Sequence, residues 1–79
     1  VNNDNVTRSI REKRNFLLKY ISNEKNDINL KYLYYDYFEK DEDNIKDIKD
    51  KLIKEIKNNW NKRFNKFYDT AIIFSKIKN

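Results

Sequence analysis

Neither glycine nor proline occurs among the 79 residues of this chain. Glycine supplies the positive φ angles of tight hairpin turns, and proline is the strongest breaker of helices and central strands. Without them tight hairpins are disfavoured, and element boundaries must be read from clusters of Asn, Asp and Ser. Two such clusters, SNEKND at 22–27 and KDEDN at 40–44, divide the chain into three segments.

The first segment has the spacing of an amphipathic helix over about 6–22. Phe16 and Tyr20 flank its apolar face, and Ser9 followed by Glu12 fits a capping box, with an earlier start at Asp4 as the alternative. The residues of that face are Val6, Ile10, Leu17 and Ile21.

The second segment predicts a helix over about 28–40, capped by Asp27. One face carries apolar residues at the i, i+3, i+4, i+7, i+8 positions. These residues are Leu30, Leu33, Tyr34, Tyr37 and Phe38. The same stretch, YLYYDYF, is the one place where a strand competes, because Tyr and Phe favour sheets, but it has no turn chemistry and no partner strand.

The third segment predicts one long helix over 44–77, about 35 residues or roughly 50 Å. A kink near 58–59, or a restart capped by Asp69 or Thr70, is the alternative. Placed at 100° per residue, the apolar residues of the whole segment share one broad face: Ile45, Ile48, Leu52, Ile56, Trp60, Phe64, Phe67, Ala71, Phe74 and Ile77. Ile72 and Ile73 lie off that face.

These patterns predict an all-α protein: a three-helix bundle with a long C-terminal helix. Residues 1–79 form a single helical domain or a fragment of a larger helical domain. The absence of methionine indicates a processed or excised segment. Two short helices cannot cover the whole of a long third helix, so the excess apolar surface predicts a protein partner, a homo-oligomer or a missing part of a larger domain.

The composition argues against an enzyme. With no histidine and no cysteine, the chain lacks the commonest bases, metal ligands and thiol nucleophiles. Acidic residues gather at 36–43, but their spacing is not that of a calcium-binding loop and its glycine is missing. We therefore expect no cofactor and no metal site. No apolar run approaches the length of a membrane span.

The net charge of +5 is unevenly distributed: residues 1–23 sum to +3, residues 24–43 to −4 and residues 44–79 to +6. On the long helix, five lysines lie away from the apolar face: Lys51, Lys54, Lys57, Lys62 and Lys76. Such a stripe could follow a nucleic-acid backbone or an anionic membrane surface. Acidic residues at 47, 50, 55 and 69 interrupt it, which favours a solvated helix surface of mixed charge.

The only tryptophan lies among basic residues, an arrangement that suits either nucleic acid or a helix seam. Trp60, Phe64 and Phe67 are spaced four and three apart and continue the apolar face of the long helix. Rings that stack on bases must be exposed. The spacing therefore predicts that these three residues belong to the core, and it leaves nucleic-acid binding to charge alone.

Three apolar residues of the second helix are surplus to a simple bundle. Ile28, Tyr32 and Tyr35 lie opposite its complete core face. Tyrosine buries a large ring, keeps a polar hydroxyl for the rim and is enriched at binding hot spots. The three residues predict a partner-binding surface; the alternatives are a central helix buried on both sides, or tyrosine content raised by an A/T-rich genome.

YYDYF at 34–38 and IKNNWNKRFNKFYD at 56–69 resemble the PHIST (PRESAN) domains of malaria parasites, which are Lys/Asn-rich and helical and have aromatic seams. RSIRE at 8–12 resembles a relaxed form of the parasite export motif, with isoleucine where leucine is usual. The resemblance implies a non-enzymatic, exported interaction module in the host-cell cytosol or cytoskeleton. It implies host cytoskeletal proteins, or the cytoplasmic tails of parasite adhesion proteins, as partners. The alternative is a basic helical domain that binds nucleic acid or an anionic membrane.

Overall fold

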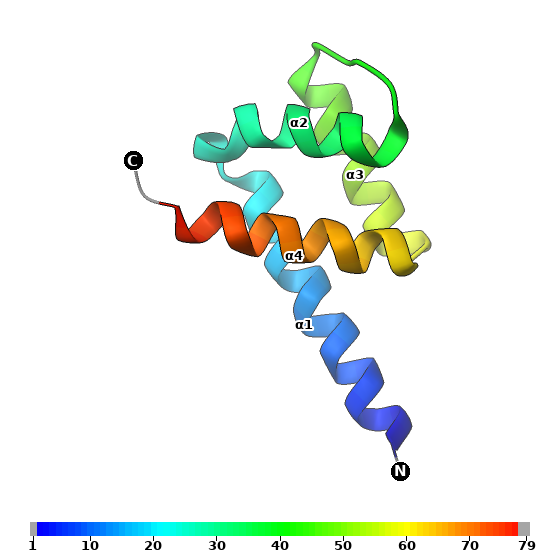
Figure 1. The fold of residues 1–79 in the computed structure, drawn as a ribbon. Coiled ribbons are helices and arrows are strands. Elements are labelled where there is room, and N and C mark those ends of the chain that lie inside the picture. The colour runs from blue at the N-terminus through cyan, green and yellow to red at the C-terminus, as the bar shows by residue number, and fades with distance from the viewer. Residues whose placement is uncertain (1, 78–79) are drawn as a thin grey trace.

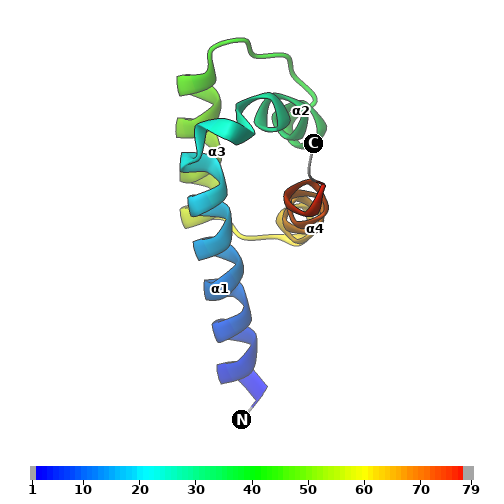
Figure 2. The ribbon, with the colours of Figure 1, turned by 90° about the vertical axis from the view of Figure 1, so that its left-hand side faces the viewer.

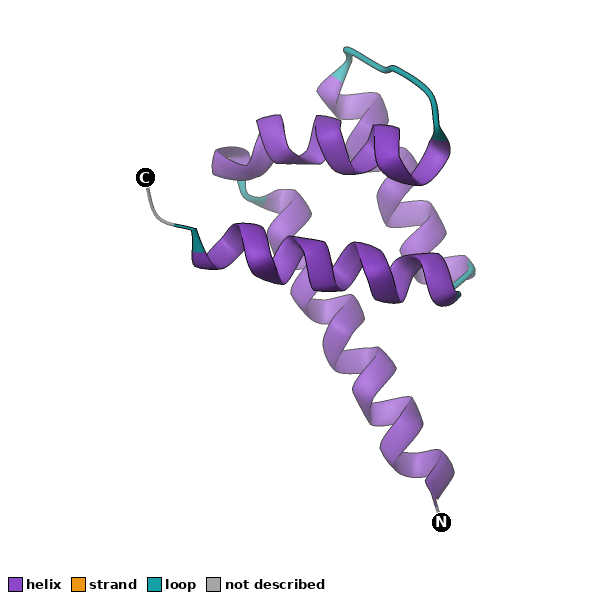
Figure 3. Cartoon of the chain, in the orientation of Figure 1, coloured by secondary structure: helices purple, strands orange, loops and turns teal. Residues whose placement is uncertain are grey.

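The structure, a computed structural model, describes the backbone of residues 2–77 and the side chains of residues 8–77, and all regular secondary structure in this part is helical. No strand occurs in this range (Figure 3). The elements are α1 (Asn2–Ser22), the short 3₁₀ helix η1 (Glu24–Asn26), α2 (Asp27–Phe38), α3 (Ile45–Asn58) and α4 (Lys62–Lys76).

Asparagine side chains replace the missing glycine and proline at the helix starts. Asn44 precedes α3, and its side-chain oxygen accepts hydrogen bonds from the backbone N–H groups of Lys46 and Asp47, at 3.0 and 3.4 Å. Asn61 does the same for α4, accepting from Arg63 and Phe64 at 2.9 and 3.3 Å. Both satisfy backbone donors that a helix start leaves free, so each asparagine defines a boundary that the composition otherwise lacks.

The end of α2 is closed by Glu39, which adopts a left-handed conformation with φ 58° and ψ 35°. Its backbone N–H donates to the Tyr35 carbonyl at 2.7 Å. This position usually holds glycine, because a side chain is unfavourable in the left-handed region. The strained conformation of Glu39 ends α2 and directs the backbone into the loop to α3.

The four α-helices form two layers. α1 and α3 lie side by side in one layer and run in opposite directions, and α2 and α4 form the other (Figures 1 and 2). α1 and α2 each pack against both α3 and α4, whereas α3 and α4, although consecutive, make little contact with each other. The N-terminal half of α1 extends beyond the body of the protein (Figure 2).

The core lies between the two layers. All its buried side chains are hydrophobic, and among the described residues no polar or charged side chain is buried. The core consists of Leu17, Tyr20, Ile21, Leu30, Leu33, Tyr34, Ile48, Leu52, Ile56, Phe64, Phe67 and Ala71. These residues come from all four helices, so the layers are held together by one shared core.

The expected single helix over 44–77 was wrong. The helix ends at Asn58, and α4 starts afresh at Lys62 after a three-residue turn, so a bundle of three helices becomes an arrangement of four. The break lies near the position considered for a kink, but Asn61 caps the restart, not Asp69 or Thr70. The turn brings α4 back against α2 and α1, where it covers core that a straight helix would leave exposed.

Two expectations for the first and last turns also need correction. α1 begins at Asn2, so Ser9 and Glu12 lie inside the helix and do not form a capping box. Ile77, placed on the core face from the periodicity, is 60% exposed because it lies just past the end of α4. The side chain of Val6 lies outside the described residues.

Replacing Glu39 by glycine should stabilise the protein by about 1 kcal/mol, because glycine adopts the left-handed conformation without the steric cost of a side chain. Urea unfolding followed by circular dichroism measures the change. The matched control is Lys40→Gly, one residue further on, where φ is not positive and the same substitution should give no gain. Equal effects of the two glycines would contradict the strain at Glu39.

Burial raises the pKa of Tyr20 above its ordinary value of 10.0, and the Asn29 side chain offsets part of the rise. The folded state therefore holds this proton more tightly than the unfolded state does. The resulting stability is fully present below pH 10 and is lost as the pH rises through the folded-state pKa. Tyr20→Phe should weaken the alkaline fall in the free energy of unfolding, measured in urea between about pH 8 and 11.

Candidate interaction surface

The three surplus residues of α2 are exposed. Ile28, Tyr32 and Tyr35 are 82%, 63% and 54% exposed. Their spacing of four and three places them on the side of α2 opposite Leu30 and Tyr34, which face the core. Since each of the three is more than half exposed, none of the other described helices covers this side of α2. The alternative of a central α2, buried on both sides, does not hold in this structure.

α4 adds a second exposed stripe beside the first. Ile73, on the side of α4 away from the core, is 58% exposed, and Ile77, just past the end of that helix, is 60% exposed. The half-buried Phe74 joins the stripes, since its ring meets that of Tyr32 edge-on with centroids 6.0 Å apart. The outer apolar face is defined by six residues: Ile28, Tyr32, Tyr35, Ile73, Phe74 and Ile77.

Sequence reasoning missed the contribution of α4 to this face. The only signal was that Ile73 lay off the apolar face at 100° per residue. The position of Ile73 would have predicted a place on the outer apolar face only if α4 had been recognised as a separate helix beside α2. Neighbouring stripes on different helices are invisible to a periodicity that treats each helix alone.

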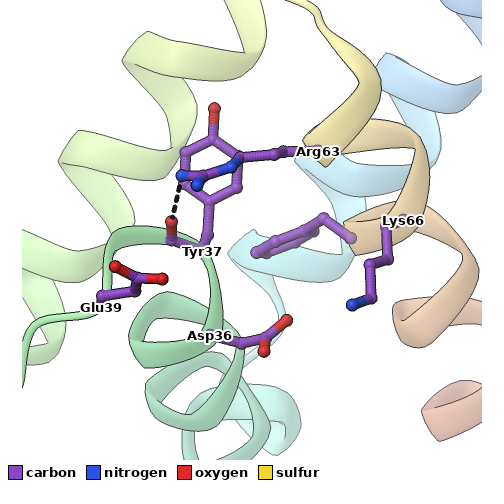
Figure 4. Close-up of a pocket in the computed structure, with 6 residues that line it drawn as sticks. Asp36, Tyr37, Glu39, Arg63 and Lys66 are labelled. Carbon is purple, nitrogen blue, oxygen red and sulfur yellow. Dashed lines mark hydrogen bonds between the residues drawn. The ribbon is translucent and has the colours of Figure 1, made fainter.

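A small polar pocket lies at the other end of the seam between α2 and α4 (Figure 4). Its volume is about 240 Å³, and it is lined by Asp36, Tyr37, Glu39, Arg63, Lys66 and Phe67. Arg63 Nη1 donates a hydrogen bond of 3.2 Å to the Tyr37 carbonyl, and the side chains of Asp36 and Lys66 extend toward each other across the opening (Figure 4). Charges of both signs therefore border the apolar face, as at the rim of a protein interface.

The predicted lysine stripe is divided between two helices. Lys51, Lys54 and Lys57 are exposed on α3, but Lys62 and Lys76 lie on α4 in the other layer. The expectation of one continuous stripe on a single helix is corrected, because the turn at 59–61 separates its two parts. Lys51 also donates a 3.4 Å hydrogen bond to the Tyr34 hydroxyl, which raises the pKa of Lys51.

Of the three aromatic residues predicted for the core, Phe64 and Phe67 are buried and Trp60 is half-buried in the turn between α3 and α4. The Trp60 ring stacks on Phe64 with centroids 5.5 Å apart, and the Arg14 guanidinium lies 5.9 Å from its centroid. Phe64 in turn stacks on Tyr37 at 4.4 Å. Trp60 is therefore engaged within the protein and does not present a free ring to a base.

The rest of the described chain offers little chemistry. A groove of about 710 Å³ runs along α1, lined by Asn15, Phe16, Leu18, Lys19 and Ser22, with no cluster of titratable groups. Among the side chains that the structure describes, residues 8–77, no group of three or more His, Cys, Asp or Glu is placed to hold a metal ion. The described helices are each too short or too polar to cross a membrane.

The chain was compared with protein-family models, with curated proteins and with solved structures, and no match was found in any of the three comparisons.

Proposed function

We propose that this domain is a non-enzymatic protein–protein interaction module that binds an amphipathic helix of a partner protein on the outer apolar face. The observation that carries the proposal is a set of five large apolar side chains, each more than half exposed, on α2 and at the C-terminal end of α4. Exposed apolar groups that cluster in this way, with a polar rim, mark interaction sites.

The shape of the face favours a helix as the ligand. Ile28, Tyr32 and Tyr35 form a ridge on α2. Ile73 and, just past the helix end, Ile77 line the end of the neighbouring α4, and the Tyr32–Phe74 contact joins the two helices. A helix with apolar residues at i, i+3, i+4 and i+7 fits between such ridges. The two tyrosines are the natural anchors, since each combines a large ring with a polar hydroxyl.

The charges beside the face favour acidic flanks on that ligand helix. Lys31, Lys66 and Lys76 are exposed on the same two helices, and Arg63 is exposed at the N-terminal end of α4, beside the polar pocket. Asp36 and Asp69 are also exposed there, so cations outnumber anions around the face. Complementary acidic residues would speed encounter and fix the register of the bound helix.

The resemblance to PHIST domains gives this proposal a biological setting. Within it, the protein is an exported malaria-parasite protein of the host-cell cytosol or cytoskeleton. The partner helix then belongs to a host cytoskeletal protein or to the cytoplasmic tail of a parasite adhesion protein. The supporting observations are the sequence segments that carry the resemblance and an all-helical fold.

The double substitution Tyr32→Ser and Tyr35→Ser tests the proposal. A displayed library of amphipathic helical peptides with acidic flanks should yield binders to the parent domain, and the double substitution should weaken them at least tenfold, because two hot-spot rings are lost. The melting temperature should move by less than about 5 °C, since both rings are more than half exposed.

The matched control is Lys54→Ser with Lys57→Ser, which introduces the same residue twice at exposed positions on α3, away from the face. This variant should bind the peptides as the parent does. A large fall in melting temperature for the tyrosine variant would assign the rings to the core. Equal losses of binding in both variants would contradict the location of the surface.

A basic surface on α3 is the second candidate, because Lys51, Lys54 and Lys57 are exposed at a spacing of three. We expect only weak binding to duplex DNA without sequence preference, with a log–log salt slope near −0.9 for each phosphate contacted. Fluorescence of Trp60 should change little, because its ring is packed on Phe64. The Lys54→Ser and Lys57→Ser variant should lower the salt slope by about 2. Sub-micromolar, sequence-selective binding at physiological salt would reverse the ranking of the two functions.

A further inference from the structure

The turn between α3 and α4 interrupts an apolar repeat without changing its phase. Ile48, Leu52 and Ile56 on α3 are buried, as are Phe64 and Phe67 on α4, and both sets keep one helical face when 45–76 is drawn as a single helix. No glycine or proline lies in the turn to forbid a helix there. The chain therefore carries the pattern of a continuous helix inside a structure in which that helix is broken.

The packing of α4 allows this segment to come from another molecule. α4 packs against α2 and α1 and makes little contact with α3, to which it is joined. Its specific contacts follow the same division: Arg63 and Phe64 meet Tyr37 of α2, and Asn65 meets Lys13 of α1 at 3.2 Å. A second copy of the chain can supply every one of these contacts.

We propose that α3 and α4 can join into one continuous helix, and that two copies of this chain then exchange α4 to form a domain-swapped dimer. The occupant of each α4 site is a second copy, because the site is complementary to α4 itself. This partner is distinct from the partner helix proposed for the outer apolar face.

Two asparagines control the balance between the closed monomer and the swapped dimer. Asn59 donates its backbone N–H to the Glu55 carbonyl at 2.8 Å where α3 ends, and Asn61 caps α4 and also donates from Nδ2 to the Tyr37 hydroxyl at 3.2 Å. Asparagine is a poor residue for a helix interior and a good cap, so both positions favour the break. The stacking of Trp60 on Phe64 joins residues four apart, a spacing that a continuous helix keeps.

The first experiment replaces Asn59 and Asn61 by alanine, which removes the cap and favours helix through the turn. Sedimentation velocity over a range of protein concentrations, after unfolding and refolding, should show at least a tenfold rise in the dimer association constant over the parent. A double variant that stays folded by circular dichroism and monomeric at every concentration would overturn the proposal.

Lys62→Pro is the matched opposite change. Proline is well tolerated as the first residue of α4, and the preceding Asn61 is already extended at φ −143° and ψ −175°, as a residue before proline prefers. Inside a continuous helix the same proline is strongly unfavourable. Adding Lys62→Pro to the two alanines should restore the monomer, and dimers that persist would count against the continuous helix. If the alanine variant does not fold, the parent and a variant with Lys62→Pro alone can be compared after refolding at millimolar concentration. The parent should form a dimer and the proline variant should not. Equal dimerisation of the two would overturn the swap.

Cross-linking identifies the exchanged element. The chain has no cysteine, so Lys13→Cys can be placed in one copy and Asn65→Cys in another, both in the background of the two alanines. After joint unfolding and refolding, a short bis-maleimide should give covalent dimers only if α4 of one copy lies on α1 of the other. Dimers without this cross-link would overturn the swap. Dimerisation that is lost with Tyr32→Ser and Tyr35→Ser would instead identify association through the outer apolar face.

Discussion

The turn at Asn59–Asn61 is the constraint on which the arrangement of the helices depends. Asn61 accepts two backbone hydrogen bonds at the start of α4 and donates a third to the Tyr37 hydroxyl, so it both restarts the helix and ties it to α2. If the chain did not change direction at this turn, α4 would continue the line of α3 away from the body. Phe64 and Phe67 would then lie exposed. With it, Phe64 stacks on Tyr37 and the two-layer core is complete. A short polar turn thus places the apolar side of α4 in the core.

The same change of direction between α3 and α4 creates the surface proposed for binding. When α4 lies beside α2, the core side of α2 packs on α3 and that of α4 packs on α1, and the opposite sides of α2 and α4 face outward (Figure 2). Tyr32 on α2 then contacts Phe74 on α4, and the exposed Ile73 and Ile77 lie in the chain on either side of Phe74. A two-layer protein has no third layer to cover this side. Large apolar residues that remain there contribute nothing to the core, which is why an external partner is the economical explanation.

How far the surface could be anticipated differs between the two helices. On α2 the periodicity was sufficient, because a complete core face in Leu30, Leu33 and Tyr34 left three apolar residues unaccounted for. On α4 it was insufficient, because an apolar face read as continuous from 45 to 77 gave no reason to separate the helix into two. The lysine stripe failed for the same reason: residues regularly spaced along a sequence share a surface only while the helix that carries them remains unbroken.

The apolar spacing alone predicted an all-helical chain, most of its core residues and the start of a helix at Asp43 or Asn44. Those properties depend on local spacing and on caps within a few residues, which a single segment contains. Three features are evident only in the folded protein: the division of residues 45–76 into two helices, the position of Trp60 in a turn and the exposure of Ile77. A helix cap changes the free energy of folding by about 1 kcal/mol. Burying Phe64 and Phe67 against α1 and α2 stabilises the fold by several kcal/mol, which is the larger effect. Long-range packing therefore chose between two local structures that the sequence supports almost equally.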